Sequence, residues 1–231
     1  MKRYRHLFFD LDRTLWDFEA NAEDTLKDIY QENNLKQKGI PSFENFKNTY
    51  RTINKDLWEK YKYNEISKEY LRIARFRKTL NYFTINDERL SDKIAEEYIT
   101  ISPTKTRLFP NTHETLKYLF PRYEMHILTN GFNEVQYVKL EKAGLKDFFD
   151  MIITSENAGS KKPDHQIFDY ALTQAKASKE ESLVIGDDLE SDIEGAANTG
   201  IDQVFVNYHK INNGVDPTYE ITDLSELRDF L

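Results

Sequence analysis

Residues 6–14 of the chain read HLFFDLDRT. The run His6–Phe9 is short and mostly apolar, which predicts a buried β-strand. Asp10 and Asp12 come next, at the point where that strand would end. Ligands of doubly wound α/β sheets bind outside the carboxyl ends of the strands, so these two carboxylates are the first candidates for chemistry.

The second half of the chain repeats this strand signal and alternates it with helical stretches. The apolar runs that predict strands are Met125–Leu128, Met151–Ile153, Leu183–Ile185 and Val204–Val206. Helical patterns lie at residues 112–120, 133–143, 164–176 and 190–199. Near-continuous apolar strands that alternate with helices are typical of parallel sheets covered on both faces. The sequence therefore predicts an α/β fold with a Rossmann-like, doubly wound parallel sheet.

Residues 17–100 have a different character. They contain one Gly and one Pro, and apolar side chains recur at steps of three and four residues between Phe43 and Tyr61. That spacing predicts an amphipathic helix. A strand and the following helix are usually joined by about 2–6 residues, so an insertion of this length is a module of its own. We predict a helical cap domain at residues 17–100, inserted into a core domain made of residues 1–16 and 101–231.

The predicted cap is rich in aromatic residues, most of which are expected to pack its own core. Trp16 and Phe18 follow the Asp10–Thr14 loop closely, and we expect them to reach the entrance of a site there. Groups that bind a metal and a phosphoryl group cannot recognise a base or a sugar. We therefore expect the cap to choose the substrate.

The overall composition excludes several classes of protein. The chain has 231 residues, of which 39% are hydrophobic, enough to bury a sizeable core. Its 32 basic and 40 acidic residues give a formal net charge of −8, and no basic run marks a surface for a nucleic-acid polymer. The absence of cysteine excludes disulfides and zinc sites built from thiolates.

The sequence also argues against a membrane protein. The apolar stretch near the N-terminus is interrupted by Asp10, so it falls short of the roughly 7–15 apolar residues of a secretory signal. No other stretch approaches the ~20 apolar residues of a membrane span. We expect a cytoplasmic protein without membrane contacts, and nothing in the sequence fixes its oligomeric state.

Polar residues follow the other predicted strands as well. The groups are Thr129-Asn130-Gly131, Lys161-Lys162-Pro163, and Gly186-Asp187-Asp188 with Asp192 beyond it. Taken singly, each has a simple structural explanation, such as a turn, a solvated lysine or a helix N-cap. In a parallel sheet these loops meet at one edge, where carboxylates offer oxygen ligands for Mg²⁺ and the other groups offer donors for phosphate.

The ordered set resembles the four motifs of the haloacid-dehalogenase-like hydrolase superfamily. The matching residues are Asp10-x-Asp12-x-Thr14, Thr129, Lys162-Pro163, and Gly186-Asp187 with Asp192. The helical insertion resembles the cap of the helical-cap members. Residues 129–132, 162–172 and 186–193 are further similar to the bacterial pyrimidine 5′-nucleotidase branch, whose members hydrolyse nucleoside monophosphates.

The resemblance implies a nucleophile, an acid–base residue and a metal site. Asp10 would attack phosphorus and form an aspartyl-phosphate. Asp12 would protonate the leaving oxygen and later activate water, and its backbone carbonyl would contact Mg²⁺. Asp10 and Asp187 would complete the Mg²⁺ site.

The resemblance also implies a phosphate site. Thr129 would bind phosphoryl oxygens through its hydroxyl, and Asn130 through its backbone N–H. Lys162 would offset the charge of the nucleophile and the phosphate. Asp188 and Asp192 remain open as metal ligands or as hydrogen-bond acceptors around the site.

Asp12 separates the possible chemistries. Dehalogenases of the superfamily lack the second aspartate of this motif, because a halide leaving group needs no proton. The sequence therefore favours a phosphatase that hydrolyses a small-molecule phosphomonoester, with nucleoside 5′-monophosphates as the first candidates. The alternatives are a phosphosugar phosphatase or a phosphomutase, which use the same aspartates. A phosphonatase ranks lower, and the intact motif set argues against a catalytically idle binding protein.

Overall fold

A computed structural model describes residues 4–211 and 214–231. The chain divides into two compact units. One consists of Met1–Phe18 and Thr106–Leu231, and the other is Glu19–Lys105. Within the described residues, no helix is both long enough and apolar enough to cross a membrane.

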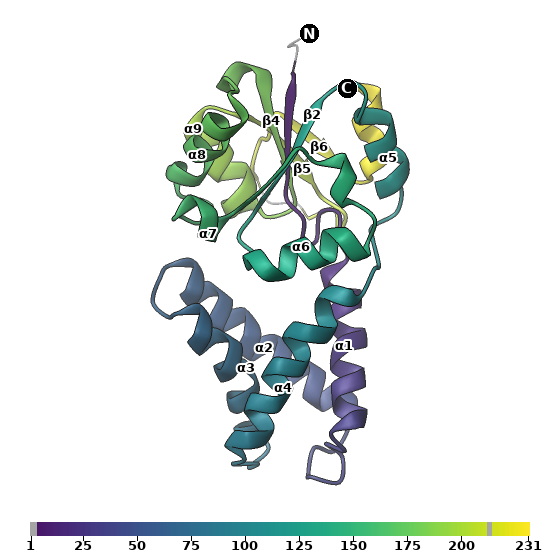
Figure 1. Cartoon of the computed structure of the whole chain (residues 1–231), viewed down its shortest axis with the longest axis vertical. Helices are drawn as coiled ribbons and strands as arrows, with labels where there is room; N and C mark the ends of the chain where they lie inside the picture. Colours follow the sequence, from purple (N-terminus) through teal and green to yellow (C-terminus); the bar gives the residue numbers. More distant parts are fainter. Residues whose placement is uncertain (1–3, 212–213) are drawn as a thin grey trace. The chain divides into compact units, whose positions relative to one another are not determined.

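The first unit is built around a parallel sheet (Figure 1). The strands of the described chain are β1 (His6–Phe9), β2 (Glu124–Thr129), β3 (Met151–Thr154), β4 (Ser182–Gly186), β5 (Asp202–Val206) and β6 (Tyr219–Ile221). Their spatial order is β3-β2-β1-β4-β5-β6, and every neighbouring pair runs parallel. The predicted Rossmann-like, doubly wound α/β fold is confirmed.

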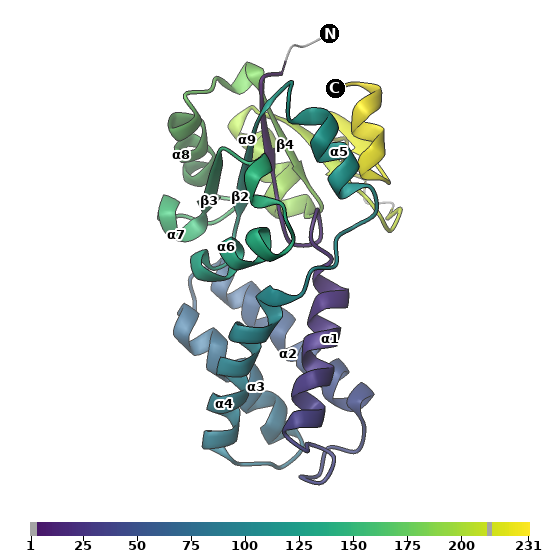
Figure 2. The ribbon, with the colours of Figure 1, turned by 45° about the vertical axis from the view of Figure 1, so that its right-hand side comes forward.

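Helices cover both faces of this sheet (Figure 2). The elements on one face include α5 (Thr112–Leu119), α6 (Asn133–Lys142) and the 3₁₀ helix η5 (Leu224–Asp229). The other face carries α8 (His165–Ala175) and α9 (Gly195–Thr199), and the short α7 (Ser155–Ala158) follows β3. Alternation along β1 explains the two layers: Leu7 and Phe9 enter the first core, whereas Phe8 enters the second.

The register of the central strands brings their carboxyl ends level. Phe9 pairs with Ile127 of β2 and with Ile185 of β4. The residues that follow these positions therefore emerge at the same edge of the sheet. The sheet extends from β1 in both directions, with β2 and β3 on one side and β4, β5 and β6 on the other. A point at which the direction of strand addition changes is where open α/β sheets bind ligands.

The second unit is helical and has its own core. Its helices are α1 (Phe18–Glu32, which begins at the boundary), α2 (Phe43–Lys62), α3 (Lys68–Tyr82) and α4 (Glu88–Ile101), followed by the 3₁₀ turn η1 (Ser102–Thr104). Side-chain oxygens of Ser42, Ser67 and Asp87 cap the N-termini of α2, α3 and α4. Phe46, Tyr50 and other apolar residues of this unit form a separate buried cluster. The periodic stretch between Phe43 and Tyr61 lies in α2, as predicted. A substrate-selecting role for the unit remains a prediction.

Candidate active site

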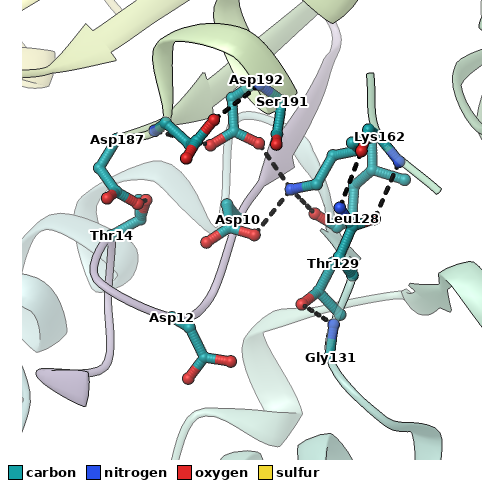
Figure 3. A network of polar contacts seen from close by, with 12 residues as sticks. Asp10, Asp12, Thr14, Leu128, Thr129, Gly131, Lys162, Asp187, Ser191 and Asp192 are labelled. Carbon is teal, nitrogen blue, oxygen red and sulfur yellow. Dashed lines mark hydrogen bonds and ion pairs between the residues drawn. The ribbon is translucent and has the colours of Figure 1, made fainter. Parts of the chain in front are cut away.

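A buried lysine lies at the centre of the carboxyl edge (Figure 3). Lys162 Nζ donates to Asp10 Oδ1 at 2.7 Å, to Asp192 Oδ1 at 2.6 Å and to the carbonyl oxygen of Leu128 at 2.8 Å. An ammonium group has three protons, so these three acceptors account for all of them. Lys162 is therefore fixed, and its charge acts on Asp10 directly.

The side chain of Asp192 reaches Lys162 through space that Gly186 leaves open. A Cβ atom on Gly186 would lie 2.2 Å from Asp192 Oδ2, so only glycine fits at that position. The same Oδ2 accepts a hydrogen bond from the backbone N–H of Asp188 at 3.1 Å. Asp188 itself caps the π-helical turn η4 (Leu189–Glu194) by accepting from the N–H of Ser191 at 2.7 Å. Asp192 thus anchors Lys162, and Asp188 is a helix N-cap.

Three carboxylates crowd together at this edge. Asp10, Asp187 and Asp192 each offer an oxygen within 4.8 Å of the others. The pKa of Asp10 is raised to about 7, because burial and the neighbouring Asp192 raise it more than Lys162 lowers it. Burial also raises the pKa of Asp187, and Asp10 and Asp192 raise it further. A divalent cation would relieve this repulsion, and a cluster made only of carboxylate oxygens suits Mg²⁺.

The loop after β1 supports Asp187. The hydroxyl of Thr14 donates to Asp187 Oδ1 at 3.0 Å, and the carbonyl oxygen of Thr14 accepts from the hydroxyl of Tyr208 at 2.8 Å. The backbone N–H of Asp10 donates to the carbonyl oxygen of Ile185 at 2.9 Å, which continues the β1–β4 pairing. Motif residues far apart in sequence are therefore joined directly.

The hydroxyl oxygen of Thr129 accepts two hydrogen bonds from its neighbours. Thr129 Oγ1 accepts from the backbone N–H of Gly131 at 3.0 Å and from Gln136 Nε2 at 2.8 Å. Both lone pairs are then occupied, and the hydroxyl proton has no acceptor within the described residues. A phosphoryl oxygen is the kind of acceptor that would complete this group.

Asn130 performs a task that the sequence motif does not reveal. Its Nδ2 donates to the carbonyl oxygen of Lys162 at 2.9 Å, and its Oδ1 accepts from the backbone N–H of Lys162 at 2.8 Å. The side chain of Asn130 therefore holds the backbone of the central lysine. The predicted contact of its backbone N–H with phosphate is a separate role and remains a prediction.

The carboxylate of Asp12 lies apart from this cluster, directed away from Asp10 and Lys162 in Figure 3. Its Oδ1 accepts from Lys139 Nζ at 2.6 Å, and its Oδ2 accepts from Gln136 Nε2 at 2.9 Å. Neither donor was predicted from the sequence. The available signal was a pair of polar residues three positions apart on a helix that covers the sheet, and such pairs also occur on solvated faces.

Trp16 does not occupy the position expected from the sequence. Its side chain is fully buried in the core of the first unit, whereas Phe18 is only partly buried. The expectation that Trp16 reaches the entrance of the site is therefore wrong. Its ring packs beneath Lys139, whose Nζ lies 4.3 Å from the ring centroid.

Two pyrimidine 5′-nucleotidases resemble the chain over nearly its whole length. It is 33% identical to the pyrimidine 5′-nucleotidase PynA of Streptococcus pneumoniae, over 99% of this chain and 95% of that protein. It is 32% identical to the pyrimidine 5′-nucleotidase YjjG of Escherichia coli, over 97% of this chain and 96% of that protein.

A solved structure has a closely similar fold. A HAD-hydrolase, YfnB from Bacillus subtilis, crystallised with magnesium, superimposes with a TM-score of 0.89 at 30% identity. The match covers 99% of this chain and 98% of YfnB. Residues 7–206 also match the family described as haloacid dehalogenase-like hydrolase, and this range includes Asp10, Thr129, Lys162 and Asp187. The chain therefore belongs to the haloacid dehalogenase-like hydrolase family.

Proposed function

We propose that the chain is a Mg²⁺-dependent phosphomonoesterase that forms an aspartyl-phosphate on Asp10. The observation that carries this proposal is the environment of the Asp10 carboxylate. Oδ1 is bound to Lys162, whereas Oδ2 accepts no hydrogen bond within residues 4–211 and 214–231. A carboxylate oxygen left unpaired beside a fixed cation is suited to attack phosphorus.

The carboxylates of Asp10 and Asp187 and the backbone carbonyl of Asp12 would hold Mg²⁺. When bound, the ion would supply positive charge that lets a phosphate dianion approach a carboxylate. Asp192 is not needed as a ligand, because its two oxygens already accept from Lys162 and from the N–H of Asp188. Its part is to keep Lys162 beside Asp10.

In the first half-reaction, Asp10 Oδ2 forms a bond to phosphorus and the bond from phosphorus to the leaving oxygen breaks. Asp12, in its protonated form, donates a proton to that oxygen, so the leaving group departs as an alcohol. Thr129 donates its hydroxyl proton to a phosphoryl oxygen and holds the group in line. Lys162 offsets the charge on the other oxygen of Asp10.

In the second half-reaction, Asp12 is a carboxylate and accepts a proton from water. The water oxygen bonds to phosphorus, and the bond between phosphorus and Asp10 breaks. The products are inorganic phosphate and the original carboxylate. Asp12 is protonated again, so the cycle is closed.

Nucleoside 5′-monophosphates, with pyrimidine bases first, are the proposed substrates. PynA and YjjG support this choice, because both align with almost the whole chain. A phosphosugar phosphatase or a phosphomutase of the same superfamily is the alternative, since the residues described above engage only a phosphoryl group and a metal.

A screen for phosphate release tests the proposal. Purified protein with Mg²⁺ is offered pyrimidine and purine 5′-monophosphates and a panel of sugar phosphates, with and without a sugar bisphosphate. Fastest release from UMP, CMP or their deoxy forms is expected. Preference for a sugar phosphate would favour the phosphosugar reading. Conversion that requires the bisphosphate and releases no phosphate would favour the mutase.

A further inference from the structure

Both oxygens of the Asp12 carboxylate are held by side chains of one helix. Lys139 and Gln136 lie three residues apart on α6, so they share a helical face. Their donors reach Asp12 Oδ1 at 2.6 Å and Asp12 Oδ2 at 2.9 Å. The Lys139 side chain is 5% exposed and the Asp12 side chain is 21% exposed, so this ion pair is largely shielded from water.

The two donors are themselves fixed by their surroundings. Lys139 Nζ lies 4.3 Å from the ring centroid of the buried Trp16. Gln136 is fully buried, and a Cβ atom on Gly131 would lie 1.9 Å from its Nε2. Gly131 therefore leaves the space through which Gln136 reaches the site.

One nitrogen atom links two groups with separate tasks. Gln136 Nε2 donates to Asp12 Oδ2 at 2.9 Å and to Thr129 Oγ1 at 2.8 Å. The proposed acid–base carboxylate and the phosphate-binding hydroxyl are thus held at a set separation. That separation matters, because the leaving oxygen and the transferred phosphoryl group are joined by a single bond.

Stability alone gives a poor account of this arrangement. A shielded ion pair adds little stability compared with apolar side chains of similar size. The Oε1 atom of Gln136 is buried and has no hydrogen-bond partner within the described residues, which lowers the stability of the fold. Such costs are typical of residues kept for a functional geometry.

We propose that Gln136 and Lys139 are positioning residues that fix the Asp12 carboxylate for proton transfer to and from the reacting oxygen. This inference rests on the proposed function, in which Asp12 is the acid–base residue. It assigns no new contact with substrate to either residue. Lys139 acts on the reaction through Asp12, and Gln136 acts through both Asp12 and Thr129.

The test compares two substrates that differ in their need for a proton. A nucleoside monophosphate releases an alkoxide, which must be protonated, whereas p-nitrophenyl phosphate releases a stable phenolate. Asp12→Asn should lose far more activity on the nucleotide, and this result tests the proposed function by itself. Lys139→Met should then lose about 10–100-fold in kcat on the nucleotide and only a few-fold on the phenyl ester, with little change in KM.

A double variant removes the remaining ambiguity. In the Asp12→Asn background, Lys139→Met should have almost no further effect, because the group it positions is already disabled. Lys139→Arg should recover much of the activity. Lys142→Met, on an exposed lysine one turn farther along α6, is the matched control and should behave as the unmodified protein. Thermal unfolding of each variant confirms that it is folded.

Gln136→Met provides the second variant and removes no charge. Because Gln136 also holds Thr129, this variant should lose activity on both substrates, with the larger loss on the nucleotide. Equal losses of Lys139→Met on both substrates, or losses that multiply with Asp12→Asn, would overturn the inference. An Asp12→Asn variant without substrate selectivity would instead overturn the acid–base role itself. The two failures are therefore distinguishable.

Discussion

The ammonium nitrogen of Lys162 lies 2.7 Å from Oδ1 of Asp10, and both side chains are buried. The contact joins residues 152 positions apart in the sequence. It holds the proposed nucleophile in one orientation and leaves its second oxygen unpaired. Because Asp192 also binds this lysine, two buried carboxylates depend on one cation.

Removing that cation should affect both stability and activity. Lys162→Met would leave Asp10 and Asp192 without their counter-charge, and breaking a buried ion pair costs about 3–5 kcal/mol. Urea unfolding should show a loss of this order, and turnover should fall by at least about 10²-fold. The double variant Lys162→Met/Asp192→Asn should recover part of the stability and none of the activity. A single variant as stable as the original protein would argue against the pairing.

Asp10→Asn should abolish phosphate release while preserving the fold. An amide has nearly the shape of a carboxylate but cannot attack phosphorus. The pKa of Asp10 is raised to about 7, chiefly by burial, so the charged carboxylate lowers the stability of the folded state. The amide should therefore leave the free energy of unfolding at pH 7–8 within about 1–2 kcal/mol of the original value. Substantial turnover by the folded variant would exclude Asp10 as the nucleophile.

Metal removal should stop the reaction, and metal binding should stabilise the protein. Thorough chelation should abolish turnover and added Mg²⁺ should restore it. A ligand that binds the folded state but not the unfolded state raises the unfolding temperature, so Mg²⁺ should shift Tm upward. Asp187→Asn should lose this shift. Asp188→Asn should keep it, because Asp188 serves as the N-cap of η4. Full activity without a divalent cation would contradict the account.

A buried pair of histidines should make the stability of the fold depend on pH. His6 Nδ1 lies 3.3 Å from His126 Nε2. His6 begins β1 and His126 lies within β2, so both are away from the carboxyl ends of the strands. Burial, together with the neighbouring His6, lowers the pKa of His126 to about 4. An unfolded histidine titrates near 6.5, so the unfolded state binds more protons between pH 6.5 and 4.

The stability that neutral His126 contributes should therefore fall as the pH drops through that window. Asp10 acts in the opposite direction, because its pKa is raised and the folded state takes up its proton first. The loss from His126 is expected to be on the order of 2–3 kcal/mol. Urea unfolding of the original protein and of His126→Gln at a series of pH values measures it as a difference between the two curves that changes with pH. His209→Gln, at an exposed position, should give a curve parallel to that of the original protein. Parallel curves for the original protein and His126→Gln from pH 7 to pH 4.5 would contradict this explanation.

Much of the fold could be predicted because its signals are local. The strands after residue 120 and the helix around Phe43–Tyr61 follow from runs and periodicities within single elements. The strand β6 was not predicted, because Tyr219–Ile221 has only three residues and one of them is exposed. A strand that short carries too little pattern to separate it from a loop.

The site was predictable to the extent that strand ends converge. Asp10, Lys162 and Asp187 were expected at one edge, and the structure brings them together. The supports of Asp12 could not be predicted, since Gln136 and Lys139 contact it across more than 120 residues of sequence. Trp16 was misjudged for a similar reason. Its burial depends on packing against residues from distant segments, and its distance from the Asp10–Thr14 loop along the chain carries no such information.

The stereochemical course at phosphorus tests the central claim most directly. A substrate with an isotopically chiral phosphoryl group is hydrolysed, and the configuration of the transferred group is determined. Transfer to Asp10 followed by transfer to water consists of two in-line displacements, each of which inverts phosphorus. The account predicts net retention of configuration. Net inversion would mean that water attacks the substrate directly, and it would contradict an aspartyl-phosphate on Asp10.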